Sequence, residues 1–147
     1  MQRVLGLFGI VLVAFATGCP QMGTQQEFSA DLTGAQEVPP VTTDGTGEGE
    51  FTLNAAQTQL SFMVTASGLS GPVTAAHFHQ GAVGVAGDIV QDIFADLEET
   101  GGNVTVMGTW DVNAEELAAL LDGNIYVNLH TEANPGGEIR GQVELVE

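Results

Sequence analysis

Hydrophobic and polar residues alternate in short runs from Glu27 onward, and clusters of glycine or proline separate these runs. Alternation with a period of two buries one face of a strand, and turn residues at intervals of about ten are typical of an antiparallel sandwich or barrel. We expect strands near 27–33, 47–54, 58–66, 73–79, 88–95, 103–111, 124–131 and 137–146. The pattern therefore predicts an all-β fold, an antiparallel, Greek-key-like β-sandwich of about eight strands.

Two of these runs predict a hairpin. Phe51 and Leu53 alternate with polar neighbours, and the same alternation resumes at Leu60, Phe62 and Val64 after the polar segment 54–58. Two alternating runs joined by a short turn favour antiparallel pairing of consecutive strands.

Residues 113–123 break the strand pattern and predict one short crossover helix. Asn113 and Glu116 fit a variant of the capping box, three leucines form an apolar stripe, and Gly123 supplies a left-handed stop. We expect the leucines to cover one end of the sandwich. The segment 36–41 contains two consecutive prolines, which remove ladder donors, so we expect a rigid surface stretch rather than a central strand.

The first 18 residues are typical of a secretory signal peptide. A short charged start is followed by an apolar stretch from Val4 to Ala16 and by small residues. About 13 apolar positions are too few for an ordinary transmembrane helix. We expect an exported protein of the cell envelope whose mature part begins after residue 18.

Cys19 follows Ala-Thr-Gly, and this context resembles the lipobox of bacterial lipoproteins. Lipid attachment to Cys19 would make the membrane a partner, with residues 19–26 as lipidated cysteine and tether. Pro20 stands where aspartate is associated with inner-membrane retention, which favours the outer membrane if the cell has two. The alternative is a secreted protein with a free or dimer-forming thiol.

The charge balance of the mature part is strongly acidic. All 19 acidic residues follow Cys19 and Arg140 is the only cation there, which gives 1 − 19 = −18. Such a balance excludes counterion-driven binding to nucleic acid. It is explained either by surface solubility or by attraction of cations or a basic partner.

The three histidines of the chain are the candidate site residues. His77 and His79 share one face of a strand, opposite Phe78, and His130 lies on the polar face of a later strand. If the two strands are neighbours, three imidazoles could form one cluster with an open position, which suits zinc or copper. The alternative is that the histidines make hydrogen bonds on a strand surface.

A turn after His130 predicts that 137–145 folds back on 124–131 as a hairpin. Ile139, Val143 and Leu145 would face the core of this hairpin. We expect Glu138 to accept a hydrogen bond from a metal-binding histidine and so orient its imidazole. We expect Arg140 to pair with a carboxylate.

Four segments in order resemble the CHRD domain family, the domain named from chordin and also found in bacterial exported proteins. They are Leu-Thr-Gly-Ala-Gln-Glu-Val-Pro-Pro-Val at 32–41, Ala-His-Phe-His-Gln-Gly at 76–81, Tyr-Val-Asn-Leu-His-Thr at 126–131 and Asn-Pro-Gly-Gly-Glu-Ile-Arg-Gly-Gln at 134–142. The resemblance implies one domain over residues 27–147, acting as a binding or structural module whose partner is an unidentified protein or small ligand.

A second, weaker similarity is to copper–zinc superoxide dismutase, also a Greek-key sandwich. His77, His79, His130 and Arg140 resemble its His-x-His pair, late histidine and arginine. This similarity implies, as the alternative function, a dismutase-like copper redox enzyme in which Arg140 steers an anion toward the metal. The chain lacks the further histidines of a dinuclear site, and no nucleophile or phosphate loop is recognisable in the sequence.

Overall fold

The computed structural model describes residues 23–147, so the predicted signal peptide and Cys19 lie outside the described residues. The strands are β1 (Gln26–Thr33), β2 (Thr46–Leu53), β3 (Gln59–Ser67), β4 (Val73–Gln80), β5 (Asp88–Asp92), β6 (Leu97–Thr100), β7 (Asn103–Asp111), β8 (Ile125–Thr131), β9 (Ile139–Gln142) and β10 (Glu144–Leu145). The helix α1 spans Ala114–Leu121, and two short 3-10 helices, η1 and η2, span Gly34–Gln36 and Phe94–Asp96.

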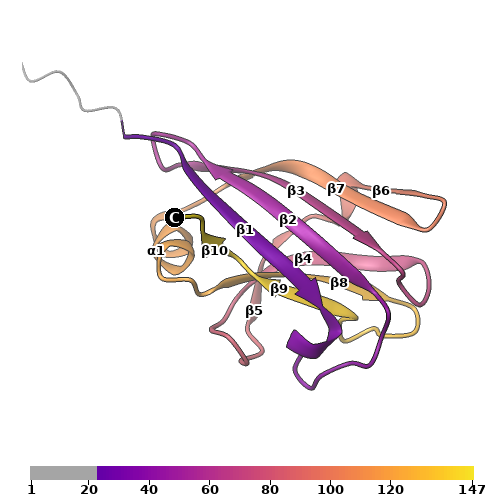
Figure 1. The fold of residues 1–147 in the computed structure, drawn as a ribbon. Coiled ribbons are helices and arrows are strands. Elements are labelled where there is room, and N and C mark those ends of the chain that lie inside the picture. The colour runs from indigo at the N-terminus through magenta and orange to yellow at the C-terminus, as the bar shows by residue number, and fades with distance from the viewer. Residues whose placement is uncertain (1–22) are drawn as a thin grey trace, which may run out of the picture.

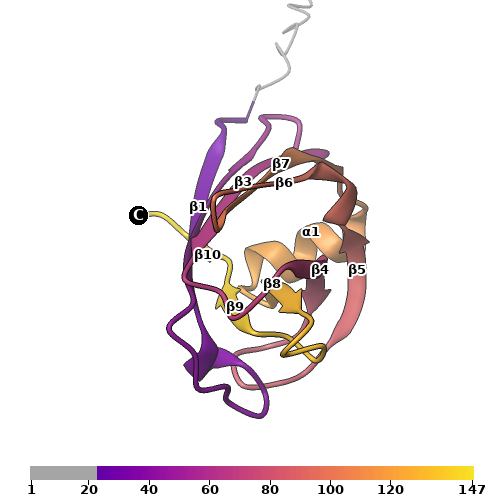
Figure 2. The same cartoon turned by 90° about the vertical axis from the view of Figure 1, so that its right-hand side faces the viewer.

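All strands pair antiparallel in one curled sheet with the order β5-β4-β8-β9-β1-β2-β3-β7-β6, and β10 pairs with β1. The strands β4, β8 and β9 lie below β1, β2 and β3 in Figure 1. Figure 2, turned by 90° about the vertical axis, shows how the sheet curls. The two parts join where Thr33 of β1 pairs with Arg140 of β9. The predicted all-β antiparallel fold is confirmed, while its Greek-key detail is not.

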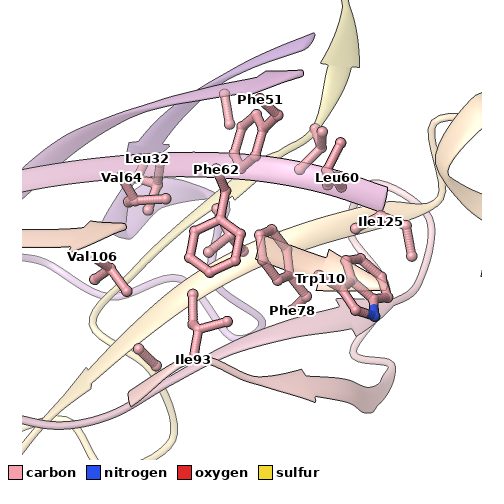
Figure 3. Close-up of a cluster of buried hydrophobic side chains, with 14 of the residues drawn as sticks. Leu32, Phe51, Leu60, Phe62, Val64, Phe78, Ile93, Val106, Trp110 and Ile125 are labelled. Atoms are coloured by element: carbon pink, nitrogen blue, oxygen red, sulfur yellow. The ribbon is translucent and has the colours of Figure 1, made fainter. Parts of the chain in front are cut away.

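The core lies between the two parts of the sheet, and Phe78 of β4 is at its centre (Figure 3). Its fully buried ring meets Phe51 and Phe62 edge-to-face, with centroids 5.8 and 5.4 Å away, and stacks on Trp110 at 5.2 Å. Each such aromatic pair contributes about 0.5–1.5 kcal/mol beyond burial of its area. Because consecutive strand residues point to opposite faces, anchoring Phe78 in the core turns both neighbouring histidines outward.

The predicted hairpin and helix are both present. Phe51 lies opposite Phe62 in the β2–β3 register. The side chain of Asn113 accepts hydrogen bonds from the first turn of α1, the side chain of Glu116 accepts one from the Asn113 backbone, and Gly123 follows the helix with φ of +70°. Among the described residues, no helix is long and apolar enough to cross a membrane.

Three details differ from the pattern-based expectation. Strand β6 was not predicted, because Leu97 is its only apolar residue and gives no alternation. The predicted strand at 137–146 is divided by Val143 into β9 and β10, and Leu145 is exposed rather than in the core. In the segment 36–41, expected at the surface, Glu37 is only 6% exposed.

Candidate metal centre

The three histidines meet on the outer face of β4 and β8, which are neighbouring antiparallel strands. Asn128 lies opposite His77 in the ladder, and His130 lies opposite Ala75. One ring nitrogen from each histidine lies within 4.8 Å of the other two, and His77 Nδ1 is 3.1 Å from His130 Nε2. The structure thus brings His77, His79 and His130 into one cluster.

Backbone carbonyls determine which nitrogens of this cluster carry protons. His79 Nδ1 lies 2.9 Å from the Gly87 carbonyl oxygen, and His130 Nδ1 lies 3.0 Å from that of Pro135. A carbonyl oxygen only accepts, so an Nδ1 atom that makes this bond donates, and the Nε2 atom of that neutral ring then presents a lone pair. His79 Nε2 is buried and has no hydrogen-bond partner among the described residues.

The surroundings keep the imidazoles neutral. Burial lowers the pKa of all three histidines below the ordinary value, and the pKa of His77 is lowered further by His130 and His79. Asp92, on the neighbouring strand β5, acts in the opposite direction on His77. Neutral imidazole is the form that binds a metal ion.

Asn128 and Glu37 lie behind the histidines. Asn128 Oδ1 is 3.1 Å from His130 Nε2, and the same side chain contacts the Glu37 carboxyl group. Burial raises the pKa of Glu37 to about 7, against the opposing effects of Arg140 and Asn128. Glu37 Oε1 is buried without a hydrogen-bond partner within residues 23–147.

The loop of residues 81–87 closes over the outer face of β8 and β9. Arg140 donates to the carbonyls of Val85 and Ala82 at 2.8 and 3.0 Å. Gln142 donates to the Gly81 carbonyl, and the Gly87 N–H donates to the Tyr126 hydroxyl. This cover explains why all seven residues of β8 are buried, although alternation predicts one polar, exposed face.

Arg140 is 2% exposed and does not have the partner that the sequence predicted. Its hydrogen bonds go to carbonyl and amide oxygens rather than to a carboxylate, and Glu37 acts on it only through charge. The guanidinium lies 3.4 Å above the Tyr126 ring, whose other neighbour is the parallel His79 ring at 4.8 Å. Arg140 therefore supports His79 through a stacked tyrosine and holds the 81–87 loop.

Three imidazole nitrogens in this arrangement could hold one metal ion. Ligands around a tetrahedral ion with bonds of about 2.1 Å are about 3.4 Å apart. The observed separations of up to 4.8 Å need only a small inward movement of the rings. The two N–H groups that donate to carbonyls match the usual support of metal-binding histidines.

The protein-family model of the CHRD domain matches residues 28–143 of the chain. The chain belongs to the CHRD domain family. No curated protein and no solved structure gave a match. In this CHRD domain the similarity to copper–zinc superoxide dismutase stays a resemblance of a few residues.

Glu138 of this CHRD domain does not orient a histidine. Its fully buried carboxylate accepts hydrogen bonds from Thr43 Oγ1 at 2.6 Å, Ser70 N at 2.8 Å, Ser70 Oγ at 2.6 Å and Thr131 Oγ1 at 2.5 Å. Burial works to raise the pKa of Glu138, but these hydrogen bonds together lower it to about 2. Glu138 holds three loops together, and the prediction that it supports the metal ligands is wrong.

Sequence reasoning missed Asn128, Glu37 and the two carbonyls that orient the histidines. Asn128 shares the strand face of His130, so its position was predictable from alternation, although its contact with the imidazole was not. The residues around Glu37 in the sequence do not indicate that it is buried, because its burial depends on segments that are distant in the sequence. The carbonyls of Gly87 and Pro135 belong to loops whose path the sequence does not reveal.

Proposed function

We propose that this CHRD domain is a metal-binding module of the cell envelope, with one copper or zinc ion held by His77, His79 and His130. The observation that carries the proposal is the fixed orientation of two imidazoles. Carbonyl acceptors occupy Nδ1 of His79 and His130, which leaves both Nε2 lone pairs beside His77.

Donor chemistry and charge support this assignment. Imidazole nitrogens suit zinc and copper, and three protein ligands leave a position open for a further ligand. His77 is half-buried while His79 and His130 are 8% and 9% exposed, so the ion would be approached past His77. The net charge of −17 of the whole chain favours accumulation of cations at its surface.

The test is metal loading of the purified protein. With copper(II) we expect one ion per chain and an electron paramagnetic resonance spectrum with nitrogen hyperfine coupling, altered by His130→Ala. The control is Gln91→Ala, which removes a half-buried side chain from the adjacent strand β5 whose amide donates to the Asp92 carbonyl. Absence of stoichiometric metal at micromolar copper or zinc would contradict the proposal.

We also propose that Cys19 carries a lipid that anchors the domain to a membrane, the outer one where two exist. The support is the lipobox-like context of Cys19 after an apolar leader. Mass spectrometry of the amino-terminal peptide should show acyl groups, and Cys19→Ser should move the protein from the membrane fraction to the soluble fraction. A wild-type protein with an unmodified thiol would overturn this proposal.

A further inference from the structure

Asn128 is the polar group whose position the three-histidine site leaves unexplained. It is 3% exposed on the outer face of β8, and its Oδ1 lies 3.1 Å from His130 Nε2. The same nitrogen lies 3.1 Å from His77 Nδ1. His79 Nε2, the third nitrogen of the cluster, has no hydrogen-bond partner in the described part of the chain.

These contacts give His130 an acceptor oxygen at each ring nitrogen, the Pro135 carbonyl at Nδ1 and Asn128 Oδ1 at Nε2. A neutral imidazole carries one proton and can satisfy only one of them. Protonating both nitrogens would place a charge on a ring that is only 9% exposed. A metal ion resolves the conflict, because it binds the Nε2 lone pair and an amide oxygen together.

Glu37 explains why the oxygen of Asn128 faces the histidines. The Asn128 side chain makes a hydrogen bond to the Glu37 carboxyl group that favours its ionised form, which is the effect of a donor. The NH₂ group of Asn128 is therefore directed to Glu37, which leaves Oδ1 for the imidazoles. Rotating the amide by half a turn would place two acceptors against each other at Glu37.

We propose that Asn128 Oδ1 is the fourth protein ligand of the metal, oriented by Glu37, so that the centre has three nitrogen donors and one oxygen donor. The inference rests on the proposed metal-binding function. This donor set contains no sulfur, and imidazole with amide oxygen favours a divalent ion, zinc or copper(II), over copper(I).

The experiment compares zinc affinity, measured by competition with a chromophoric chelator, and the copper(II) resonance spectrum of full-length variants. We expect Asn128→Ala to weaken zinc binding roughly 10- to 100-fold and to change the copper spectrum. Asn128→Asp keeps an oxygen in place but replaces the donor toward Glu37 by a second acceptor, so it should bind zinc more tightly than Asn128→Ala does. Gln91→Ala should leave both measurements unchanged.

Asn128→Ala with wild-type zinc affinity and an unchanged copper spectrum would overturn the fourth-ligand assignment, even where His130→Ala removes the metal. If circular dichroism shows that Asn128→Ala does not fold, Asn128→Asp decides. A shifted copper spectrum in that variant supports oxygen ligation, and an identical spectrum with identical affinity overturns it. Failure of the wild-type protein to bind either metal would instead refute the three-histidine site itself.

Discussion

Two buried polar clusters lie on opposite faces of β8, and the consecutive residues His130 and Thr131 each belong to one of them. In the first, both oxygens of Glu138 accept hydrogen bonds, four in all, from Thr43, Ser70 and Thr131. In the second, His79 Nε2 is buried and has no hydrogen-bond partner among the described residues. The carboxylate of one cluster has its hydrogen bonds within the protein, and the other cluster keeps a buried nitrogen without one.

This difference supports a structural role for Glu138 and the proposed binding role for the histidines. A buried charge that is fully hydrogen-bonded stabilises the segments that supply its partners. A buried group without a partner costs stability, and such groups are retained where a ligand completes them. The sequence predicted the three histidines as metal ligands and Glu138 as their support, and the hydrogen bonds of Glu138 instead separate it from the histidines.

The largest expected effect is the loss of the Glu138 cluster. Glu138→Ala leaves Thr43, Ser70 and Thr131 without their acceptor in a buried place, so the free energy of unfolding should fall by about 4 kcal/mol. Urea unfolding of metal-free protein measures it. Glu132→Ala, in the same loop but exposed, should change stability by less than about 0.5 kcal/mol. A loss below about 1 kcal/mol for Glu138→Ala would contradict a structural role.

Zinc should stabilise the folded protein through the histidine cluster. This stabilisation should not depend on the Glu138 cluster. At free zinc 100 times the dissociation constant, binding to the folded state alone adds about 2.7 kcal/mol to the free energy of unfolding. His79→Gln should remove this increment, measured against the metal-free baseline of the same variant, because it takes away one of the three ligands. Glu138→Gln should lower the stability of the metal-free protein but keep the full gain in the free energy of unfolding on adding zinc. An increment that disappears in Glu138→Gln would show that the two clusters are coupled.

Alternation along the strands was enough to predict much of the site. Because Phe78 is in the core, His77 and His79 had to face outward, and the polar position of His130 followed from its apolar neighbours. Adjacency of β4 and β8 was not predictable, since the two strands are separated by several elements and pairing depends on the whole sheet.

Long-range loop positions explain the failures. Glu138 stands before a predicted strand with nothing to indicate that Thr43 and Ser70, far away in sequence, would bind it. Arg140 was expected to pair with a carboxylate because ion pairing is the usual role of a lone cation. The 81–87 loop instead supplies carbonyl acceptors, and the pattern of polar and apolar residues does not predict where a loop will lie.

The smallest expected effect is the separation of the two clusters by pH. Burial lowers the pKa of the histidines in the folded state, so below 6.5 the unfolded chain binds more protons and metal-free stability falls as pH decreases. Glu138, whose pKa is lowered from 4.5 to about 2, loses its contribution only between those values. Glu37, whose pKa is raised to about 7, has the opposite effect on stability between pH 4.5 and 7, so variants must be compared with wild type at each pH.

The measurement is the urea midpoint at pH 7.5, 5.5 and 3. Replacing all three histidines by glutamine should reduce the loss of stability between pH 7.5 and 5.5. Glu138→Gln should reduce only the loss at pH 3, and equal slopes for wild type and both variants would mean that neither cluster controls the acid response.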